Sequence, residues 1–329
     1  MNRIPVTILT GFLGAGKTTL LNHLIETHPD TKFAVIENEF GEIGIDNELV
    51  VGADDGIFEM SNGCICCTLN DELVETLAKL LNGAYKFDHL LIETTGIAEP
   101  DAVAAAFVAD ASVQEYFELN AVICLADANN IEDMMQEREE AKRQITFSDY
   151  ILLNKQSEVG PEYLEKLKGI LHKANPLATI FPCDYAKTTV DLLKLDAYKA
   201  INVEDKLREI HKPHGHSHDD HHHHHEQHND IISHSFIIDE PFDMLKLRHW
   251  LQVLLMLQGE GIYRIKGVLN VQWQDRKVIV QSVRKAHSIT LGGEWPEGKP
   301  RQSRIVFIGR NLRKDILEKN LKQLQALAF

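Results

Sequence analysis

The sequence predicts an α/β protein whose first part carries a mostly parallel β-sheet, followed by a smaller α+β domain with an antiparallel sheet. Two observations support this prediction. Short apolar runs alternate with amphipathic segments through residues 1–200, the order typical of β-α-β units. After residue 230 one strand and one helix precede several short strands and a last helix. The 329 residues are enough for about two domains.

The elements of the first part follow from their apolar patterns. Short runs rich in Val, Ile, Leu and Phe predict strands that are buried on both faces, as in a parallel sheet, at 6–9, 33–36, 89–92, 121–126, 150–153 and 179–181. Segments in which apolar residues recur every three or four positions predict helices at 17–26, 71–81, 131–140 and 162–174.

A polar segment separates the two parts. Residues 211–230 consist mainly of His, Asp, Gly, Ser and Gln and have no apolar periodicity, so we expect a linker. The domains are then 1–210 and 231–329. In the second domain we expect strands and helices, in chain order, at 231–238 (strand), 244–257 (helix), 262–268, 277–283 and 304–308 (strands) and 314–327 (helix).

Charge is distributed unevenly along the chain. The formal net charge is −15, but residues 1–230 carry −22 and residues 231–329 carry +7. An acidic chain is poorly suited to nucleic acid or an anionic membrane surface, so neither is an expected partner. The first residues lack the apolar length of a secretory signal, and no segment reaches the ~20 apolar residues of a membrane span. We therefore expect a cytoplasmic protein.

Residues 11–18, GFLGAGKT, fit the phosphate-loop pattern G-x-x-x-x-G-K-[ST]. The motif follows the first predicted strand and opens the first predicted helix, so its backbone N–H groups would face an anion. Lys17 would reach the β- and γ-phosphates of a nucleotide, and the Thr18 hydroxyl would bind magnesium. The nucleotide-binding residues expected here are Gly11, Gly14, Ala15, Gly16, Lys17, Thr18 and Thr19.

A second motif supports nucleotide chemistry. The apolar run at 90–92 ends in Glu93, and Gly96 follows shortly after. A carboxylate at the end of such a strand can hold magnesium through water, as a Walker B acid does. The Gly96 N–H could donate to the γ-phosphate. With Lys17 and Thr18, Glu93 and Gly96 complete the predicted catalytic set.

The base-reading motif departs from its pattern. Residues 154–157, NKQS, resemble the guanine-specific N-K-x-D, and Asn154 and Lys155 fit. Ser157 stands where the pattern has an aspartate, the acid that accepts hydrogen bonds from guanine N–H groups. Glu158 is a candidate substitute. We favour GTP over ATP, and a P-loop kinase that uses ATP stays an alternative.

Three cysteines crowd into four positions, Cys64, Cys66 and Cys67. Clustered thiols in a reducing compartment indicate metal binding or redox chemistry, and soft thiolates suit zinc or Cu(I) rather than magnesium. The acidic segment after the second predicted strand adds Glu37 and Glu42 as candidate oxygen ligands. A redox pair for the cysteines and a solvated loop for the glutamates are the alternatives.

Histidines concentrate in the linker. Ten of the 17 lie within residues 211–228, where imidazole groups would bind zinc, cobalt or nickel with modest selectivity. The alternative is an inert polar linker. The candidate ligands are His214, His216, His218, His221 and His223. For the isolated His23, His28, His89 and His249 we expect surface or packing roles, and for Cys124 burial in a strand.

Together, residues 11–18, 37–42, 64–67 and 93–96 closely resemble the CobW-like P-loop GTPases, a metallochaperone-type family related to HypB and UreG. The order and spacing match over residues 1–200, and residues 265–267 and 305–309 look like the family's C-terminal domain. The resemblance implies GTP hydrolysis to GDP with magnesium, a thiolate-bound metal that is usually zinc, and delivery of that metal to client proteins. A homodimer is compatible with it.

The motif order also predicts a coupled switch. The cysteines lie between residues 37–42 and 93–96, the two segments expected to sense the γ-phosphate, so the metal ligands would respond to the nucleotide. The first hypothesis is a metal-binding GTPase that allocates zinc. The alternative is a metal reservoir or sensor whose nucleotide regulates its interactions.

Overall fold

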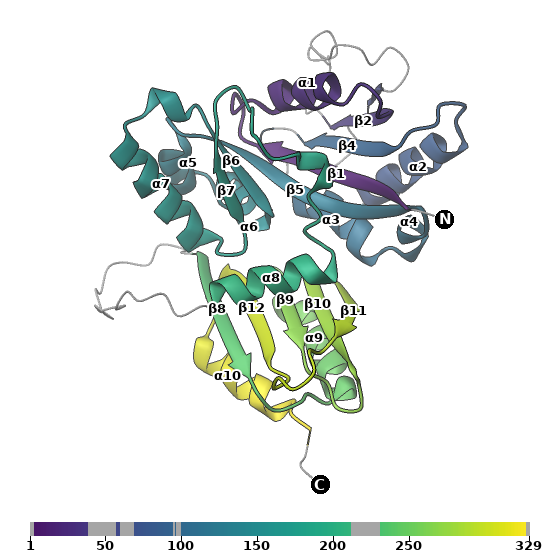
Figure 1. Ribbon diagram of the computed structural model, residues 1–329, viewed down its shortest axis with the longest axis vertical. Helices are drawn as coiled ribbons and strands as arrows, with labels where there is room; N and C mark the ends of the chain where they lie inside the picture. Colours follow the sequence, from purple (N-terminus) through teal and green to yellow (C-terminus); the bar gives the residue numbers. More distant parts are fainter. Residues whose placement is uncertain are drawn as a thin grey trace. The chain divides into compact units, whose positions relative to one another are not determined.

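The computed structural model describes residues 3–38, 57–59, 69–94, 96, 100–211 and 231–326. The chain divides into two compact units, Met1–Tyr198 and Lys199–Phe329, each with its own sheet (Figure 1). The first sheet is parallel throughout and the second is antiparallel, which confirms the predicted fold class.

The first sheet has seven strands in the order β3-β2-β4-β1-β5-β6-β7. Strands β2 to β4 lie on one side of β1 and β5 to β7 on the other, so the chain changes direction across the sheet at β1. Ligands of such sheets bind beyond the carboxyl ends of the strands at this switch point. The strands are β1 (Ile4–Gly11), β2 (Phe33–Asn38), β3 (Ile57–Glu59), β4 (His89–Thr94), β5 (Phe117–Asp127), β6 (Tyr150–Asn154) and β7 (Thr179–Pro182).

The helices of the first unit differ from prediction in three places, one of which is the short helix Ala111–Tyr116, which the sequence reasoning did not predict. The segment predicted as one helix at 131–140 is two helices, because Arg138 adopts an extended conformation between them. Residues 100–109 form a helix rich in alanine that lacks the amphipathic stripe on which the prediction relied. The helices are α1 (Lys17–Thr27), α2 (Leu69–Asn82), α3 (Pro100–Ala109), α4 (Ala111–Tyr116), α5 (Ile131–Glu137), α6 (Glu139–Phe147) and α7 (Pro161–Ala174).

Apolar cores cover both faces of the first sheet. Along β5, Ile123 and Leu125 pack in the cluster that contains the leucines of α1, whereas Cys124 and Ala126 pack with side chains of α6 and α7. Successive residues of a strand point to opposite faces, so a strand buried on both sides is apolar at every position. This explains why the strand was recognisable as a continuous apolar run. Cys124 is 1% exposed, which confirms the expected buried position, and this burial raises the pKa of its thiol to about 12.

The second unit is built on a sheet with the order β11-β10-β9-β12-β8. It begins with α8, a helix that the sequence reasoning did not predict and had included in the first domain; α8 packs on β9, β11 and β12 of this sheet. The elements are α8 (Ala200–Ile210), β8 (Ile231–Ile238), α9 (Met244–Gln258), β9 (Ile262–Leu269), β10 (Arg276–Val283), β11 (Ala286–Glu294), β12 (Ser303–Arg310) and α10 (Lys314–Gln323).

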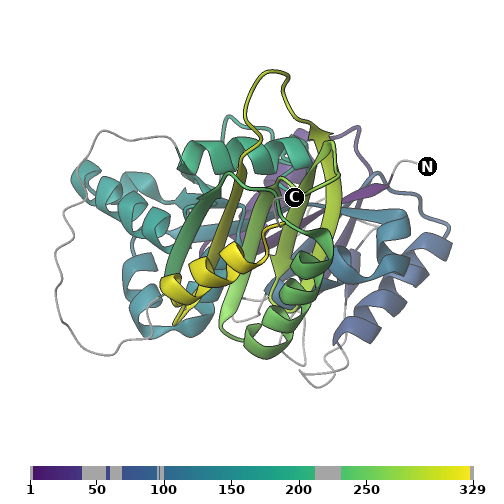
Figure 2. The ribbon, with the colours of Figure 1, turned by 90° about the horizontal axis from the view of Figure 1, so that it is seen from below.

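The two faces of the second sheet differ in chemistry. On one face, leucines of α9 and α10 pack with Ile265, Val280 and Phe307 in a single apolar core, and Figure 2 shows both helices on that side. The alternate positions of the same strands, which include Lys266 and Arg304, belong to the opposite face. Among the described residues, no helix is both long and apolar enough to cross a membrane.

Candidate nucleotide-binding site

The phosphate-binding loop connects the end of β1 to the start of α1. Gly11, Gly14 and Gly16 all have positive φ angles, of 137°, 77° and 107°. A side chain at Gly11 would collide with the backbone carbonyl oxygen of Leu125, and a Cβ at Gly16 would lie 2.8 Å from Asn154 Nδ2. The loop therefore requires glycine for both conformation and space. The first N–H groups of α1 point out of its N-terminus, the arrangement that binds phosphate.

Side chains from α1 and β4 meet beside this loop. Lys17 is buried, and its Nζ donates a hydrogen bond to the Phe12 carbonyl oxygen at 3.5 Å. The Thr18 hydroxyl donates to Glu93 Oε1 at 3.2 Å, whereas Thr19 is exposed. A hydroxyl and a carboxylate are the oxygen ligands that magnesium prefers, so the Thr18–Glu93 pair fits such an ion.

Gly96 packs against the same loop. It is buried, and a Cβ at this position would lie 2.7 Å from the backbone nitrogen of Leu13. The Gln144 side chain on α6 is almost fully buried and donates from Nε2 to the Gly96 carbonyl oxygen at 3.0 Å. Sequence reasoning missed Gln144, because one glutamine in an amphipathic helix gives no signal.

Three glutamates share one register at the carboxyl edge of the sheet. Glu37 on β2 pairs with Glu93 on β4 and with Glu59 on β3. Strand β2, which carries the candidate metal ligand Glu37, is therefore the direct neighbour of β4, which carries the candidate magnesium ligand Glu93. Sequence reasoning did not single out Glu59, because β3 is only three residues long.

Asn154 joins the phosphate loop to the turn after β7. This side chain is 3% exposed; its Nδ2 donates to the Ala15 carbonyl oxygen at 2.9 Å, and its Oδ1 accepts from the Ala186 N–H at 3.0 Å. It therefore holds two loops together with its own polar atoms. The next residue, Lys155, has a φ of 61° and donates from Nζ to Asp127 Oδ2 at 2.6 Å.

Ser157, which stands where the guanine-specific pattern has an aspartate, contacts a different acid, Asp184. Ser157 donates its backbone N–H and its hydroxyl to Asp184 Oδ1, at 3.1 and 2.9 Å. The Ser157 N–H lowers the pKa of Asp184, so the carboxylate is ionised at neutral pH. Glu158, the substitute considered from sequence, instead accepts a hydrogen bond from Asn129 Nδ2 at 2.7 Å.

Residues 5–182 of this chain match the protein family CobW/HypB/UreG, nucleotide-binding domain. This span contains the phosphate-binding loop, Glu93 and Asn154. The chain belongs to this family. A second family, the cobalamin synthesis protein cobW C-terminal domain, matches residues 231–325.

Two curated members of the CobW/HypB/UreG family illustrate the similarity. The zinc chaperone YjiA of Escherichia coli (strain K12) is 34% identical over 316 residues, which cover 95% of this chain and 96% of YjiA. The zinc-regulated GTPase metalloprotein activator 1 of Schizosaccharomyces pombe is 31% identical, covering 95% and 84%. The crystal structure of Zn(II)-bound YjiA GTPase from E. coli matches with a TM-score of 0.70 and 30% identity, covering 99% of this chain and 100% of YjiA.

Most of the predicted metal ligands of this CobW/HypB/UreG member lie outside the described residues. Within the described ranges, no group of three or more His, Cys, Asp or Glu side chains is arranged to hold a metal ion. Glu37 is placed by its backbone register. The ligands that fall outside are Cys64, Cys66, Cys67, Glu42, His214, His216, His218, His221 and His223.

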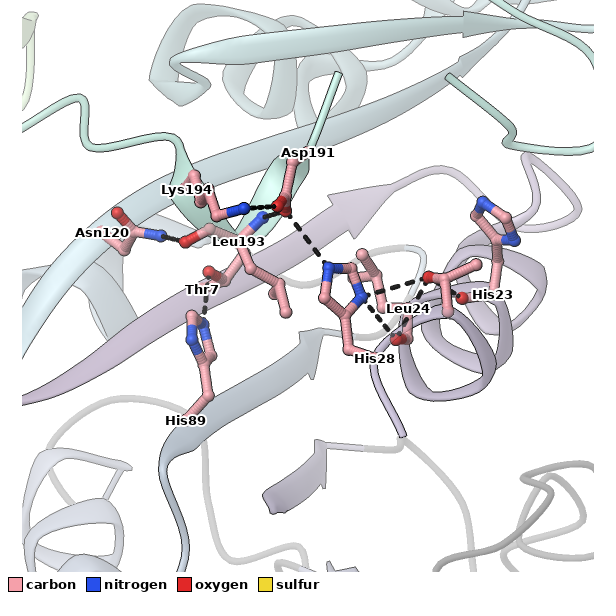
Figure 3. Close-up of polar contacts among 10 residues, drawn as sticks. Thr7, His23, Leu24, His28, His89, Asn120, Asp191, Leu193 and Lys194 are labelled. Atoms are coloured by element: carbon pink, nitrogen blue, oxygen red, sulfur yellow. Dashed lines mark hydrogen bonds and ion pairs between the residues drawn. The ribbon is translucent and has the colours of Figure 1, made fainter. Parts of the chain in front are cut away.

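The isolated histidines have local roles, as expected. His89 is buried on β4, where its Nε2 lies 2.9 Å from the Thr7 hydroxyl, and burial lowers its pKa to about 4. His28 lies between the Leu24 carbonyl oxygen and Asp191, at 3.0 and 3.2 Å (Figure 3). These contacts tie elements of the first unit together.

Proposed function

We propose that this chain is a zinc-binding GTPase that acts as a metallochaperone and couples GTP binding and hydrolysis to the transfer of zinc to client proteins. One observation carries the proposal: Glu37, a candidate zinc ligand, is the register partner of Glu93, the candidate magnesium ligand, on neighbouring strands. The names of the relatives, a zinc chaperone and a zinc-regulated GTPase activator, support it.

The nucleotide phosphates bind on the loop at 11–18, and the base lies toward Asn154 and Lys155. Lys17 supplies a positive charge at the β- and γ-phosphates, and Gly96 supplies a backbone N–H. Thr18 and Glu93 would hold magnesium, which neutralises phosphate charge when bound. Because Lys17 is already buried against the loop, little reorganisation is needed to place its charge.

The metal cargo is held by Cys64, Cys66 and Cys67 together with Glu37 or Glu42. Thiolates bind zinc strongly, and a carboxylate completes a site that can exchange its ion. The linker at 211–230 collects ions through its histidines, and its low selectivity admits cobalt or nickel. In the cytoplasm, where thiols stay reduced, the cysteines keep their metal-binding form.

Coupling follows from the neighbouring strands. In the GTP state the γ-phosphate, with magnesium held by Thr18 and Glu93, would order the ends of β2 and β4, and hydrolysis would release them. Since Glu37 lies on β2, the zinc ligands adopt their tight arrangement with GTP and loosen with GDP. The client metalloprotein then receives the ion after hydrolysis.

Phosphate release from GTP tests the proposal. We expect hydrolysis in the presence of magnesium, a change in its rate on addition of one equivalent of zinc, and a loss of at least about a hundredfold in Lys17→Ala. Lys79→Ala, at an exposed position on α2, is the matched control. A rate that does not respond to zinc would favour the reservoir or sensor, and equal rates in Lys17→Ala would refute the predicted catalytic site.

A further inference from the structure

Guanine presents two donors, its ring N1–H and its exocyclic amine, which need a carboxylate acceptor if the site is to discriminate against adenine. Ser157 cannot supply that acceptor. Asp184, in the turn that follows β7, lies beside Ser157, and its Oδ1 accepts two hydrogen bonds from Ser157. The carboxylate is therefore fixed within hydrogen-bonding distance of the residue that the usual aspartate would occupy.

The turn that carries Asp184 has an unusual backbone. Tyr185 and Ala186 have φ angles of 53° and 57°, and the Lys187 N–H bonds to the Asp184 carbonyl oxygen at 3.0 Å. Positive φ at two consecutive non-glycine residues costs free energy, and such strain concentrates at functional sites. Asn154 holds the turn in place through the Ala186 N–H, so the same residue fixes the phosphate loop and the position of Asp184.

We propose that Asp184, oriented by Ser157, reads the guanine base in place of the missing aspartate; this inference rests on the proposed GTPase function. The acid has moved from the loop after β6 to the turn after β7, and Ser157 anchors it there. Glu158 does not serve this role, because its carboxylate is bonded to Asn129.

The test measures binding of GDP, xanthosine diphosphate and ADP, each with magnesium, by isothermal titration calorimetry. In Asp184→Asn the amide can donate to the C2 carbonyl oxygen of xanthine, so we expect xanthosine diphosphate to bind at least about tenfold more tightly than in the wild type. GDP should bind at least about tenfold more weakly. Glu158→Gln is the matched control and should change each affinity less than about twofold.

The outcomes separate the two claims. Wild-type protein that binds GDP no better than ADP refutes the guanine preference of the proposed function. Wild-type protein that prefers GDP, together with Asp184→Asn that does not gain xanthosine diphosphate, refutes the role of Asp184 alone. A gain of binding cannot result from misfolding, so the expected result is specific. A change of preference from GDP to xanthosine diphosphate in Glu158→Gln would instead assign recognition of the guanine base to Glu158.

A second inference comes from a cavity wholly within the second unit. A pocket of about 250 Å³ lies between α8 and the loop that joins β11 to β12. Its charged lining residues are Glu204, Arg208, Lys299 and Arg304, beside Trp295. This volume is below the usual range for drug-sized ligands, so it suits a small group.

Donors in this pocket outnumber acceptors. Glu204 already pairs with Arg208 and with Lys277, whose Nζ lies 2.7 Å from its Oε2. Trp295 Nε1 and Arg304 Nε are buried and have no hydrogen-bond partner in the described part of the chain. Burial and the charge of Arg208 lower the pKa of Arg304, whereas the charge of Glu204 raises it. Arg304 also donates from Nη2 to Gln302 Oε1 at 2.7 Å. Glu204 is therefore shared among several cations, and positive charge is in excess at the pocket.

We infer that this pocket binds the oxyanion group of a small ligand, a carboxylate or a phosphate, among its cations Arg208, Lys299 and Arg304. These three cations line the pocket with one acid, Glu204, which is already paired. Guanidinium groups favour a carboxylate or phosphate oxyanion over a neutral group.

The indole N–H signals of the three tryptophans give a direct test. In GDP- and magnesium-loaded protein, where the phosphate loop is filled, we titrate inorganic phosphate and, separately, acetate, and follow the ¹H–¹⁵N spectrum. The Trp295 signal should shift saturably with at least one of the two anions, and the anion that binds more tightly identifies the group. Arg304→Gln should weaken that affinity at least about tenfold, whereas Arg301→Gln, at an exposed ion pair with Asp275, should not. No saturable shift of Trp295 with either anion, or equal affinity in Arg304→Gln, would overturn the inference.

Discussion

Replacement of Asn154 by alanine tests how the nucleotide site is held together. The side chain satisfies the Ala15 carbonyl oxygen and the Ala186 N–H, both in buried residues. Each group left unsatisfied in a buried position costs about 1–3 kcal/mol. The turn after β7 can relax part of its strain when the Ala186 bond is lost, which offsets some of the cost. We therefore expect the first unit to lose about 2–4 kcal/mol of unfolding free energy.

The assay must report on the first unit alone. All three tryptophans lie in residues 231–329, so fluorescence follows the other unit, and hydrogen exchange of peptides from β1 and β6 is the better probe. A loss of about 2–4 kcal/mol corresponds to roughly 30-fold to 1,000-fold faster exchange. Asn129→Ala, at an exposed asparagine, should change exchange less than about threefold. Exchange in Asn154→Ala within threefold of the wild type would refute this account.

Three further predictions concern single sites. Gly11→Ala should weaken GDP binding at least about tenfold by calorimetry, because its φ of 137° and the Leu125 carbonyl exclude a side chain; unchanged affinity would contradict this. His89 has its pKa lowered to about 4, so the unfolded chain protonates first and stability falls as pH drops from 6.5 to about 4. His89→Gln should remove roughly 3 kcal/mol of that loss in urea titrations, and an unchanged pH slope would refute the assignment. Asp243 accepts hydrogen bonds from the first turn of α9, so Asp243→Ala should cost the second unit about 1 kcal/mol by tryptophan fluorescence, and no measurable loss would show that the cap is dispensable.

The fold was predictable because its signals are local. Strand β5 contains an unbroken apolar run at 121–126, and the loop at 11–18 carries its own glycine pattern. Elements without such signals were missed: α3 lacks a polar stripe, and β3 is three residues long. The sequence also could not show that α8 packs on the second sheet, because its amphipathic pattern fits any apolar surface.

The residues of the candidate site likewise divide into those that sequence motifs predicted and those that only the structure shows. Lys17, Thr18 and Glu93 belong to motifs with fixed spacing, and the fold brings them together because β1 and β4 are neighbours. The contact between Ser157 and Asp184 joins two connections that follow different strands, so only the three-dimensional arrangement shows it. Gln144 likewise reaches the site from a helix whose sequence has no motif.

The central claim is that the nucleotide controls zinc affinity through the neighbouring strands β2 and β4. The most direct measurement is the zinc dissociation constant by equilibrium dialysis, with a non-hydrolysable GTP analogue and with GDP, in wild type and in Lys17→Ala. We predict at least about tenfold tighter zinc binding with the GTP analogue, and loss of this difference in Lys17→Ala. Equal zinc affinity in the two nucleotide states of the wild type would contradict the account.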